Sequence, residues 1–221
     1  MFHVVGAVFG KVDRPVEGFK GMPVDAMIKE FYNADPQSGR DRGFLIMSAM
    51  MHPLIFAQLA GASGHELKAH MQDFDKLLAW WYVGEDMPAE HNTITLDPEV
   101  KDGHGMPVAR LTHTWTESDK RVSRDAQMRI EELMKSAGAR DTWNFPAGRC
   151  GAYHLMGSCR MGNALESSVV DQWGRTHDVP NLYIADGSVF VTSSPSEPTL
   201  TIQALALRTA DQLVLQARGS V

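Results

Sequence analysis

The last third of the chain, from Gly151 to Leu215, constrains the fold more than any other stretch. His154 lies in a turn punctuated by glycines, and the apolar run NLYIADGS over 181–188 predicts a strand. A polar loop then leads to Pro198, and the helical pattern after it is uninterrupted, which is typical of a helix start. The unpaired N–H groups of a helix start favour an anion. The sequence therefore places a residue suited to proton transfer and an anion site in one compact unit.

A series of motifs between Tyr153 and Arg208 carries a resemblance to a known family. The matching residues are Tyr153, His154, Gly157–Gly162, Val170–Asp171, Asn181–Phe190, Pro198–Ile202 and Ala204–Arg208. In this order they closely resemble the C-terminal segment of the glucose-methanol-choline (GMC) oxidoreductases, which are FAD-dependent oxidases and dehydrogenases of alcohols and sugars. Several motifs in order are far more specific than any one of them. Bacterial sugar and polyol dehydrogenases are the most similar branch.

A second, weaker match covers Asn92–Asp97 and Asp102–Pro107, which resemble paired strands of the family's substrate domain. The family's nucleotide-binding turn, Gly-x-Gly-x-x-Gly between a strand and a helix, is absent from the sequence. Gly6–Gly10 and Gly18–Gly21 have the wrong spacing for it. The resemblance thus implies the C-terminal part of such an enzyme, as a truncated product, a fragment or one half of a split protein, with the N-terminal dinucleotide-binding half missing.

The patterns along the chain predict an α+β or α/β fold in two parts. Residues 1–145 are expected to form a substrate-binding domain, a sheet with helices on one face. Residues 146–221 are expected to complete an FAD-binding domain and the active site. Strands are expected at 1–10, 80–85, 92–96, 108–115 and 182–184, helices over 65–78 and 117–136, a buried helix or irregular core segment within 44–62, and a linker over 141–149.

Composition limits the classes of partner. With 43% hydrophobic and 22% charged residues, the chain resembles an ordinary globular protein. Its net charge of −6 and the lack of a basic cluster argue against a nucleic-acid partner. The longest apolar stretch, 44–62, is interrupted by His52-Pro53, so no membrane span is expected. No secretory signal opens the sequence, and cytoplasmic and periplasmic locations both stay open.

Two cysteines, Cys150 and Cys159, flank His154. A zinc site would lack a fourth ligand and the usual Cys-x2-Cys spacing, so no metal is expected. Two buried free thiols are favoured over a disulfide that closes this short loop.

Oxidation of an alcohol by a flavin requires that the hydroxyl proton leave and that the carbon pass a hydride to the flavin. Histidine suits the first event because it can accept and return a proton near neutral pH. His154 stands at the position of the family's active-site histidine. The resemblance therefore implies His154 as proton acceptor, FAD as hydride acceptor, and a sugar, polyol or related alcohol as substrate.

The family's second active-site position, commonly Asn or His, is Glu197 in this chain. An ionised carboxylate accepts hydrogen bonds but cannot donate one. Two roles stay open. Glu197 either orients His154 or binds a polyhydroxylated substrate, or it turns away, interacts with the helix start and leaves the second position vacant.

The resemblance also implies which residues meet the cofactor. The Asp186-Gly187 turn would approach the FAD pyrophosphate and ribityl chain. The backbone amides of Thr199, Leu200 and Thr201, after Pro198, would lie near the pyrimidine edge of the isoalloxazine ring. The alternative to an active enzyme part is a catalytically silent fragment, or a non-catalytic subunit that needs a partner chain with the Gly-x-Gly-x-x-Gly half. A separate electron-acceptor protein is a further expected partner.

Overall fold

The computed structural model describes residues 1–50, 52–145 and 153–219, and the chain divides into two compact units. The first unit comprises Met1–Phe2, Asp86–Thr116 and His154–Val221. The second comprises His3–Glu85 and Glu117–Tyr153. These units do not follow the boundary expected at residue 145, because 86–116 groups with the C-terminal block. The assignment of 1–145 to substrate binding and of 146–221 to flavin binding stays a prediction.

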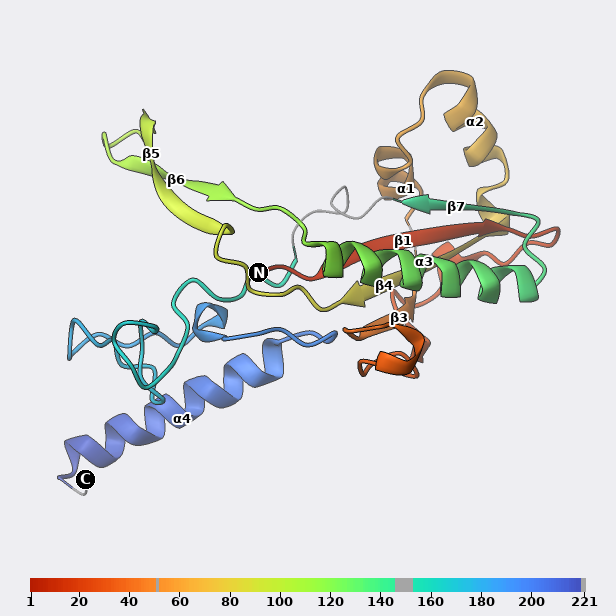
Figure 1. The fold of residues 1–221 in the computed structure, drawn as a ribbon. Helices are drawn as coiled ribbons and strands as arrows, with labels where there is room; N and C mark the ends of the chain where they lie inside the picture. The colour runs from red at the N-terminus through yellow and green to blue at the C-terminus, as the bar shows by residue number, and fades with distance from the viewer. Residues whose placement is uncertain (51, 146–152, 220–221) are drawn as a thin grey trace. The chain divides into compact units, whose positions relative to one another are not determined.

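The second unit is built on a five-stranded antiparallel sheet in the order β2-β3-β4-β1-β7 (Figure 1). Its central pair aligns over its full length, with Val4 opposite Gly84 and Lys11 opposite Leu77. Both central strands are rich in β-branched and aromatic residues, which fit a pleated, buried surface. The strands are β1 (Val4–Lys11), β2 (Met27–Ile28), β3 (Phe44–Ser48), β4 (Leu77–Gly84) and β7 (Asp141–Phe145).

Helix α3 (Glu117–Ser136) covers one face of this sheet (Figure 1). Its start and its end before Ala137-Gly138 confirm the sequence-based prediction. Apolar residues about one helical turn apart form the stripe that faces the strands. The fully buried members of that stripe are Val122, Ala126, Ile130 and Met134.

Glycines in the strands let α3 approach the sheet closely. A Cβ on Gly84 would lie 2.5 Å from Val122 Cγ1, and one on Gly10 would lie 2.8 Å from Met134 Sδ. Both distances are too short for real contacts, so a larger residue would push the helix away from the strands. Gly6 and Gly10 both lie within β1, which agrees with the expectation that this pair is not a nucleotide-binding turn.

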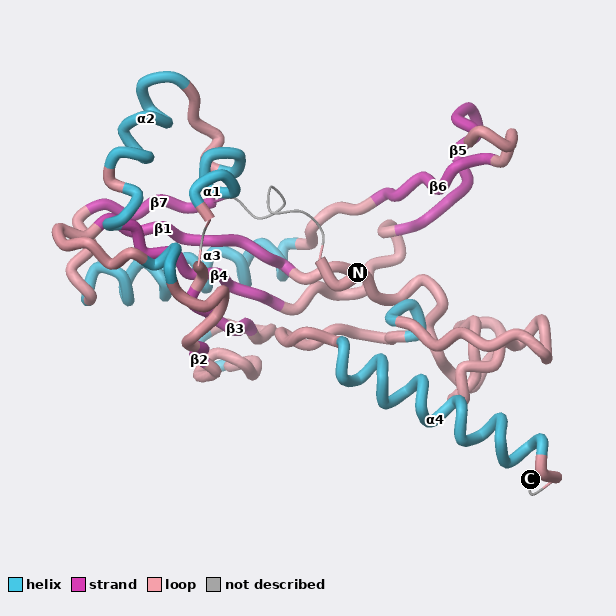
Figure 2. Tube along the Cα trace, turned by 180° about the vertical axis from the view of Figure 1, so that it is seen from behind, coloured by secondary structure: helices cyan, strands magenta, loops and turns pink. Residues whose placement is uncertain are grey.

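The opposite face of the sheet is packed against α1 (Pro53–Leu59) and α2 (Gly64–Gln72) (Figures 1 and 2). Phe56 of α1 is fully buried, and its ring lies 5.3 Å from that of Phe9 in an edge-on contact. Met71 of α2 packs against the same cluster. The predicted mixed α/β class is confirmed. The sheet is antiparallel, and helical residues lie on both of its faces instead of the one face expected.

Two segments of this unit differ from the sequence-based prediction. Phe44–Ser48, expected within a helix or irregular segment, is strand β3, and the helix begins only at Pro53. A short apolar run has no period that separates a buried strand from a buried helix. The expected linker over 141–149 begins as edge strand β7, because Trp143 stacks on Phe9 at a centroid distance of 5.7 Å.

A charge cluster on this unit gives a prediction for acid stability. Asp73 forms ion pairs with Lys11 and Lys76. The hydrogen bonds from Lys11 and then Lys76 lower the pKa of Asp73 from 3.8 to about 2. A carboxyl whose pKa is depressed in the folded state adds stability above its ordinary value, and that stability is lost as the pH falls toward the depressed value. We therefore expect Asp73→Asn to flatten the loss of stability between about pH 4 and pH 2.

Urea unfolding midpoints measured across that pH window test this expectation. Glu66→Gln, on the exposed surface of α2, is the matched control. An equal flattening in both variants would contradict the assignment to Asp73.

The first unit contains the hairpin of β5 (Thr93–Lys101) and β6 (Pro107–Thr112), the 3-10 turn η4 (Gly187–Val189) and the long helix α4 (Thr199–Ala217) (Figure 2). The hairpin confirms the paired strands expected from the sequence. Helix α4 buries only Thr209 and Gln212, whereas Leu200 and Leu207 are 79% and 68% exposed. Among the described residues, no helix combines the length and apolar character that a bilayer span requires.

The prediction of a strand near Leu182–Ile184 is wrong. Its segment forms one isolated bridge, from Tyr183 to Arg175, instead of a ladder. Gly174 lies opposite it with a positive φ of 78°, so the facing chain turns and cannot continue as a strand. The two segments are joined by hydrogen bonds on either side of that turn.

Candidate active site

The turn that bears His154 is held in an uncommon backbone conformation. His154 has a φ of 57°, and Gly157 and Ser158 follow with φ of 78° and 82°. The left-handed region is uncommon for residues with a side chain, although histidine is among the more tolerant types. Met1 and Met156 clamp the turn, since the amide of Met156 donates to Met1 O at 3.1 Å and the terminal amine of Met1 donates to Met156 O at 3.0 Å. The surrounding chain therefore fixes the half-buried His154.

The segment after His154 runs alongside the η4 turn. Three backbone amides, of Gly157, Cys159 and Met161, donate to the carbonyl oxygens of Gly187, Ser188 and Val189, at 3.1, 3.0 and 2.9 Å respectively. This series of hydrogen bonds fixes the register between the histidine turn and the Asp186-Gly187 turn.

Buried Gly187 is the point at which three predicted site segments meet. A Cβ on Gly187 would lie 2.8 Å from Leu155 O, next to His154, and 3.3 Å from Ile202 Cδ1, in the first turn of α4. No side chain fits between these groups without displacing backbone. The structure thus brings together the His154 turn, the Asp186-Gly187 turn and the start of α4.

The side chain of Asp186 stabilises its own turn. Its Oδ1 accepts the amide hydrogen of Ser188 at 2.8 Å and caps η4. The hydroxyl and then the amide of Ser188 lower the pKa of the Asp186 carboxyl below its ordinary value. The group is therefore ionised at neutral pH, and it can accept hydrogen bonds from a ligand but cannot donate them.

The start of α4 offers donors without a capping side chain. Pro198 occupies the cap position, and the first intrahelical bond runs from Ile202 N to Pro198 O at 2.9 Å. The amides of Thr199, Leu200 and Thr201 precede that bond, on residues whose side chains are exposed. Unpaired amides and the positive end of the helix dipole suit an anionic or electron-rich group at this point.

Glu197 is exposed, and its carboxylate forms no hydrogen bond or ion pair with any residue that the structure describes. The roles of His154 and Glu197 stay predictions, as do those of Asp186, Gly187 and Pro198–Thr201. Cys159 is half-buried, and Cys150 lies outside the described residues, so their expected relationship is untested. Across residues 1–50, 52–145 and 153–219, no three side chains of His, Cys, Asp or Glu gather as a metal site.

The sequence reasoning missed a buried cluster around Asp86 in the same unit. Asp86 is fully buried, and its Oδ2 accepts the amide hydrogen of Phe2 at 2.6 Å and lies 3.3 Å from His113 Nε2. Ser193 binds the Asp86 backbone twice, accepting from its N–H at 3.1 Å and donating to its carbonyl at 2.9 Å. The ring of Phe2 lies 4.5 Å from that of His113. These four residues are far apart in the sequence, so no spacing motif could have revealed the cluster.

The comparisons with known proteins agree with this picture. The family model described as GMC oxidoreductase matches residues 88–206, which is more than half of the chain. A 2-methyl-1,2-propanediol dehydrogenase of Mycolicibacterium austroafricanum is 35% identical over 96% of this chain and 41% of its own length. A fructose dehydrogenase large subunit of Gluconobacter japonicus is 32% identical over 59% of this chain and 24% of its own length.

A solved structure gives the same fold at low identity. A variant of formate oxidase from Aspergillus oryzae RIB40, solved for the effect of the substitution on FAD modification, has a TM-score of 0.64 and 14% identity. The match covers all of this chain and 47% of that one.

The matched region defines the family of the chain. The chain belongs to the GMC oxidoreductase family, and it spans less than half the length of these relatives.

Proposed function

We propose that this chain supplies the proton-accepting part of an FAD-dependent oxidoreductase that oxidises a CH–OH group of a sugar, polyol or related alcohol. The observation that carries the proposal is the meeting of the His154 turn, the Asp186 turn and the α4 start around Gly187. The names of the two relatives support the substrate class, since one is a dehydrogenase of a diol and the other of a ketose sugar.

The residues present fit a flavin cofactor. The uncapped amides of Thr199, Leu200 and Thr201 suit the electron-rich pyrimidine edge of an isoalloxazine ring. The ionised carboxylate of Asp186 can accept hydrogen bonds from the ribityl hydroxyls, whereas it would repel the pyrophosphate. We therefore assign Asp186 to the ribityl chain and leave the phosphates to residues outside this chain. The bare backbone at Gly187 permits close approach of a ligand.

When bound, FAD would accept the hydride that leaves the alcohol carbon. His154 takes the hydroxyl proton on a ring nitrogen, and the electron density left on oxygen makes the carbon a better hydride donor. The clamped backbone at Met156, two residues after His154, limits the positions that the imidazole can reach. The carboxylate of Glu197 accepts a hydrogen bond either from the imidazolium or from a further substrate hydroxyl, or it takes no part.

A second part of the protein, or a partner chain, would carry the nucleotide-binding turn. Helix α4 exposes Leu200 and Leu207 together with Val214, while it buries two polar residues. Exposed apolar surface of this kind marks an interaction site. We propose that the nucleotide-binding half covers these residues, and that the chain alone is inactive without it.

Flavin absorbance tests this function. We expect the chain to be colourless alone, and to form a yellow complex when produced with a family nucleotide-binding half. That complex should oxidise sugars or polyols with an artificial dye as acceptor, and replacing the dye with oxygen, a quinone or a protein acceptor would identify the natural one. A soluble complex that stays colourless with added FAD would overturn the cofactor assignment. A yellow complex that oxidises none of these alcohols would favour a non-catalytic subunit.

A further inference from the structure

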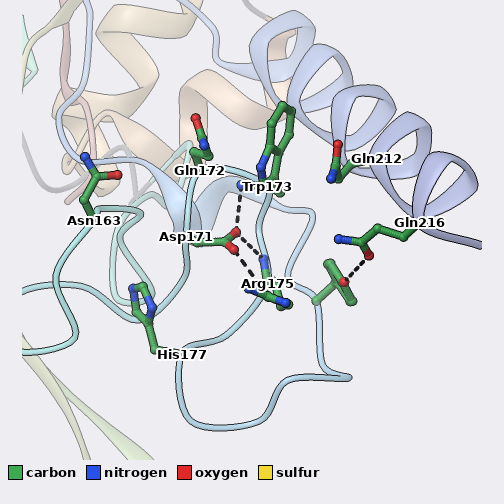
Figure 3. Close-up of a pocket in the computed structure, with 9 residues that line it drawn as sticks. Asn163, Asp171, Gln172, Trp173, Arg175, His177, Gln212 and Gln216 are labelled. Atoms are coloured by element: carbon green, nitrogen blue, oxygen red, sulfur yellow. Dashed lines mark hydrogen bonds and ion pairs between the residues drawn. The ribbon is translucent and has the colours of Figure 1, made fainter. Parts of the chain in front are cut away.

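A cavity in the first unit is lined by none of the predicted site residues (Figure 3). It has a volume of about 340 Å³ and lies between the 163–183 loops and the second half of α4. That volume falls within the ~300–1,000 Å³ range of small-molecule sites. At the helical rise per residue, Gln212 lies about 20 Å along α4 from Thr199. The lining residues are Asn163, Asp171, Gln172, Trp173, Arg175, His177, Tyr183, Gln212 and Gln216.

One wall of this cavity is pre-organised by a local turn. Asp171 Oδ1 accepts the amide hydrogens of Trp173 at 2.8 Å and of Arg175 at 3.1 Å. The buried hydroxyl of Thr209 donates to the carbonyl of Trp173 at 2.8 Å. The guanidinium of Arg208 lies 4.6 Å from the centre of the Trp173 ring. Trp173 is therefore held at its backbone from both sides and braced at its ring.

The opposite wall presents a polar side chain without a partner among the described residues. Gln212 is only 7% exposed, and its amide forms no hydrogen bond with any residue that the structure describes (Figure 3). By contrast, Gln216 accepts the Tyr183 hydroxyl hydrogen at 3.1 Å, and the Thr209 hydroxyl donates to the Trp173 carbonyl. Because Gln212 lines the cavity, a ligand there could make the missing hydrogen bonds.

The chemistry of the lining indicates the ligand. Asp171 and Arg175 face one another at 3.4 Å, so their charges offset each other. Most of the remaining polar lining groups are amides, which both donate and accept hydrogen bonds. The rings of Trp173 and Tyr183 add apolar surface of the kind against which sugar C–H groups pack. We propose that this cavity is a binding site for a neutral polyhydroxylated ligand, a sugar or polyol, separate from the candidate active site.

Calorimetric titration of the purified chain with D-glucose, D-fructose and D-mannitol tests the proposal. We expect at least one of them to bind, and Gln212→Leu to weaken that binding about tenfold or more, since one hydrogen-bonded amide is lost. Gln203→Leu, an exposed glutamine on the same helix, is the matched control and should bind like the unchanged chain. Gln212→Leu should melt at about the same temperature as the unchanged chain, because the amide forms no hydrogen bond with the described residues.

The outcomes are separable from those of the proposed function, because no flavin, nucleotide-binding half or turnover is needed. Failure of all three compounds to bind would overturn the site. Equal affinities in Gln212→Leu and Gln203→Leu would also overturn it, as would binding of inorganic phosphate in preference to the neutral compounds. A lower melting temperature in Gln212→Leu would show that the amide has a structural role instead.

Discussion

Replacing His154 with glutamine is expected to lower kcat/KM for alcohol oxidation by about 10²–10⁴-fold in the assembled, flavin-containing protein. Glutamine keeps a polar side chain of similar reach and can hold a hydroxyl by a hydrogen bond. It cannot accept the proton, so the alcohol oxygen keeps its hydrogen while the hydride leaves. The measurement is steady-state oxidation with an artificial acceptor, normalised to bound flavin.

Bound flavin separates this effect from damage to the site, because the variant should keep its yellow absorbance. His104→Gln is the matched control, since His104 is exposed in the turn of the β5–β6 hairpin. A loss of similar size in His104→Gln, or turnover unchanged in His154→Gln, would remove His154 from the mechanism. Glu197→Gln in the same assay separates the two roles left open for Glu197. Unchanged turnover would exclude a role toward His154 or the substrate, and it would leave an interaction of the exposed carboxylate with the start of α4 as its role.

The sequence predicts those elements whose patterns are long or unambiguous. Strand β1 and the β5–β6 hairpin follow from β-rich runs bounded by turn residues, and α3 from a repeated apolar stripe. Strand β3 was missed because its short apolar run, Phe44–Met47, fits a buried helix equally well. Strand β7 was missed because its place in the sheet depends on contacts with Phe9, 134 or more residues away, which no local pattern records.

The candidate site likewise has parts that the sequence predicts and parts that it does not. His154, Asp186-Gly187 and the α4 start are local motifs, and the structure brings their backbones together around Gly187. That meeting point was not itself predicted, because it depends on how the loops fold back. The Asp86 cluster and the Gln212 cavity were also missed, since their members interact across long separations and show no characteristic spacing.

Asp86→Ala is expected to destabilise the folded chain by about 3 kcal/mol. The fully buried Asp86 joins three distant segments. Its carboxylate contacts the Phe2 amide and His113 Nε2, and its backbone N–H donates to Ser193. Alanine would leave the Phe2 amide without its acceptor and His113 without its carboxylate, and it would open a cavity where the carboxyl group lies. Denaturant unfolding followed by tryptophan fluorescence measures the loss.

Asp86→Asn separates hydrogen bonding from charge at this position. Its amide oxygen can still accept from Phe2, so it should retain part of the stability that alanine loses. Asp178→Ala, an exposed carboxylate in the same unit, is the control and should change the unfolding free energy by less than about 0.5 kcal/mol. If Asp86→Ala lost no more stability than Asp178→Ala, the cluster would not hold Phe2, His113 and Ser193 together. Since Ser193 lies four residues before Glu197, a loosened cluster should also raise amide hydrogen exchange in the 193–197 segment, which links this buried carboxylate to the start of α4.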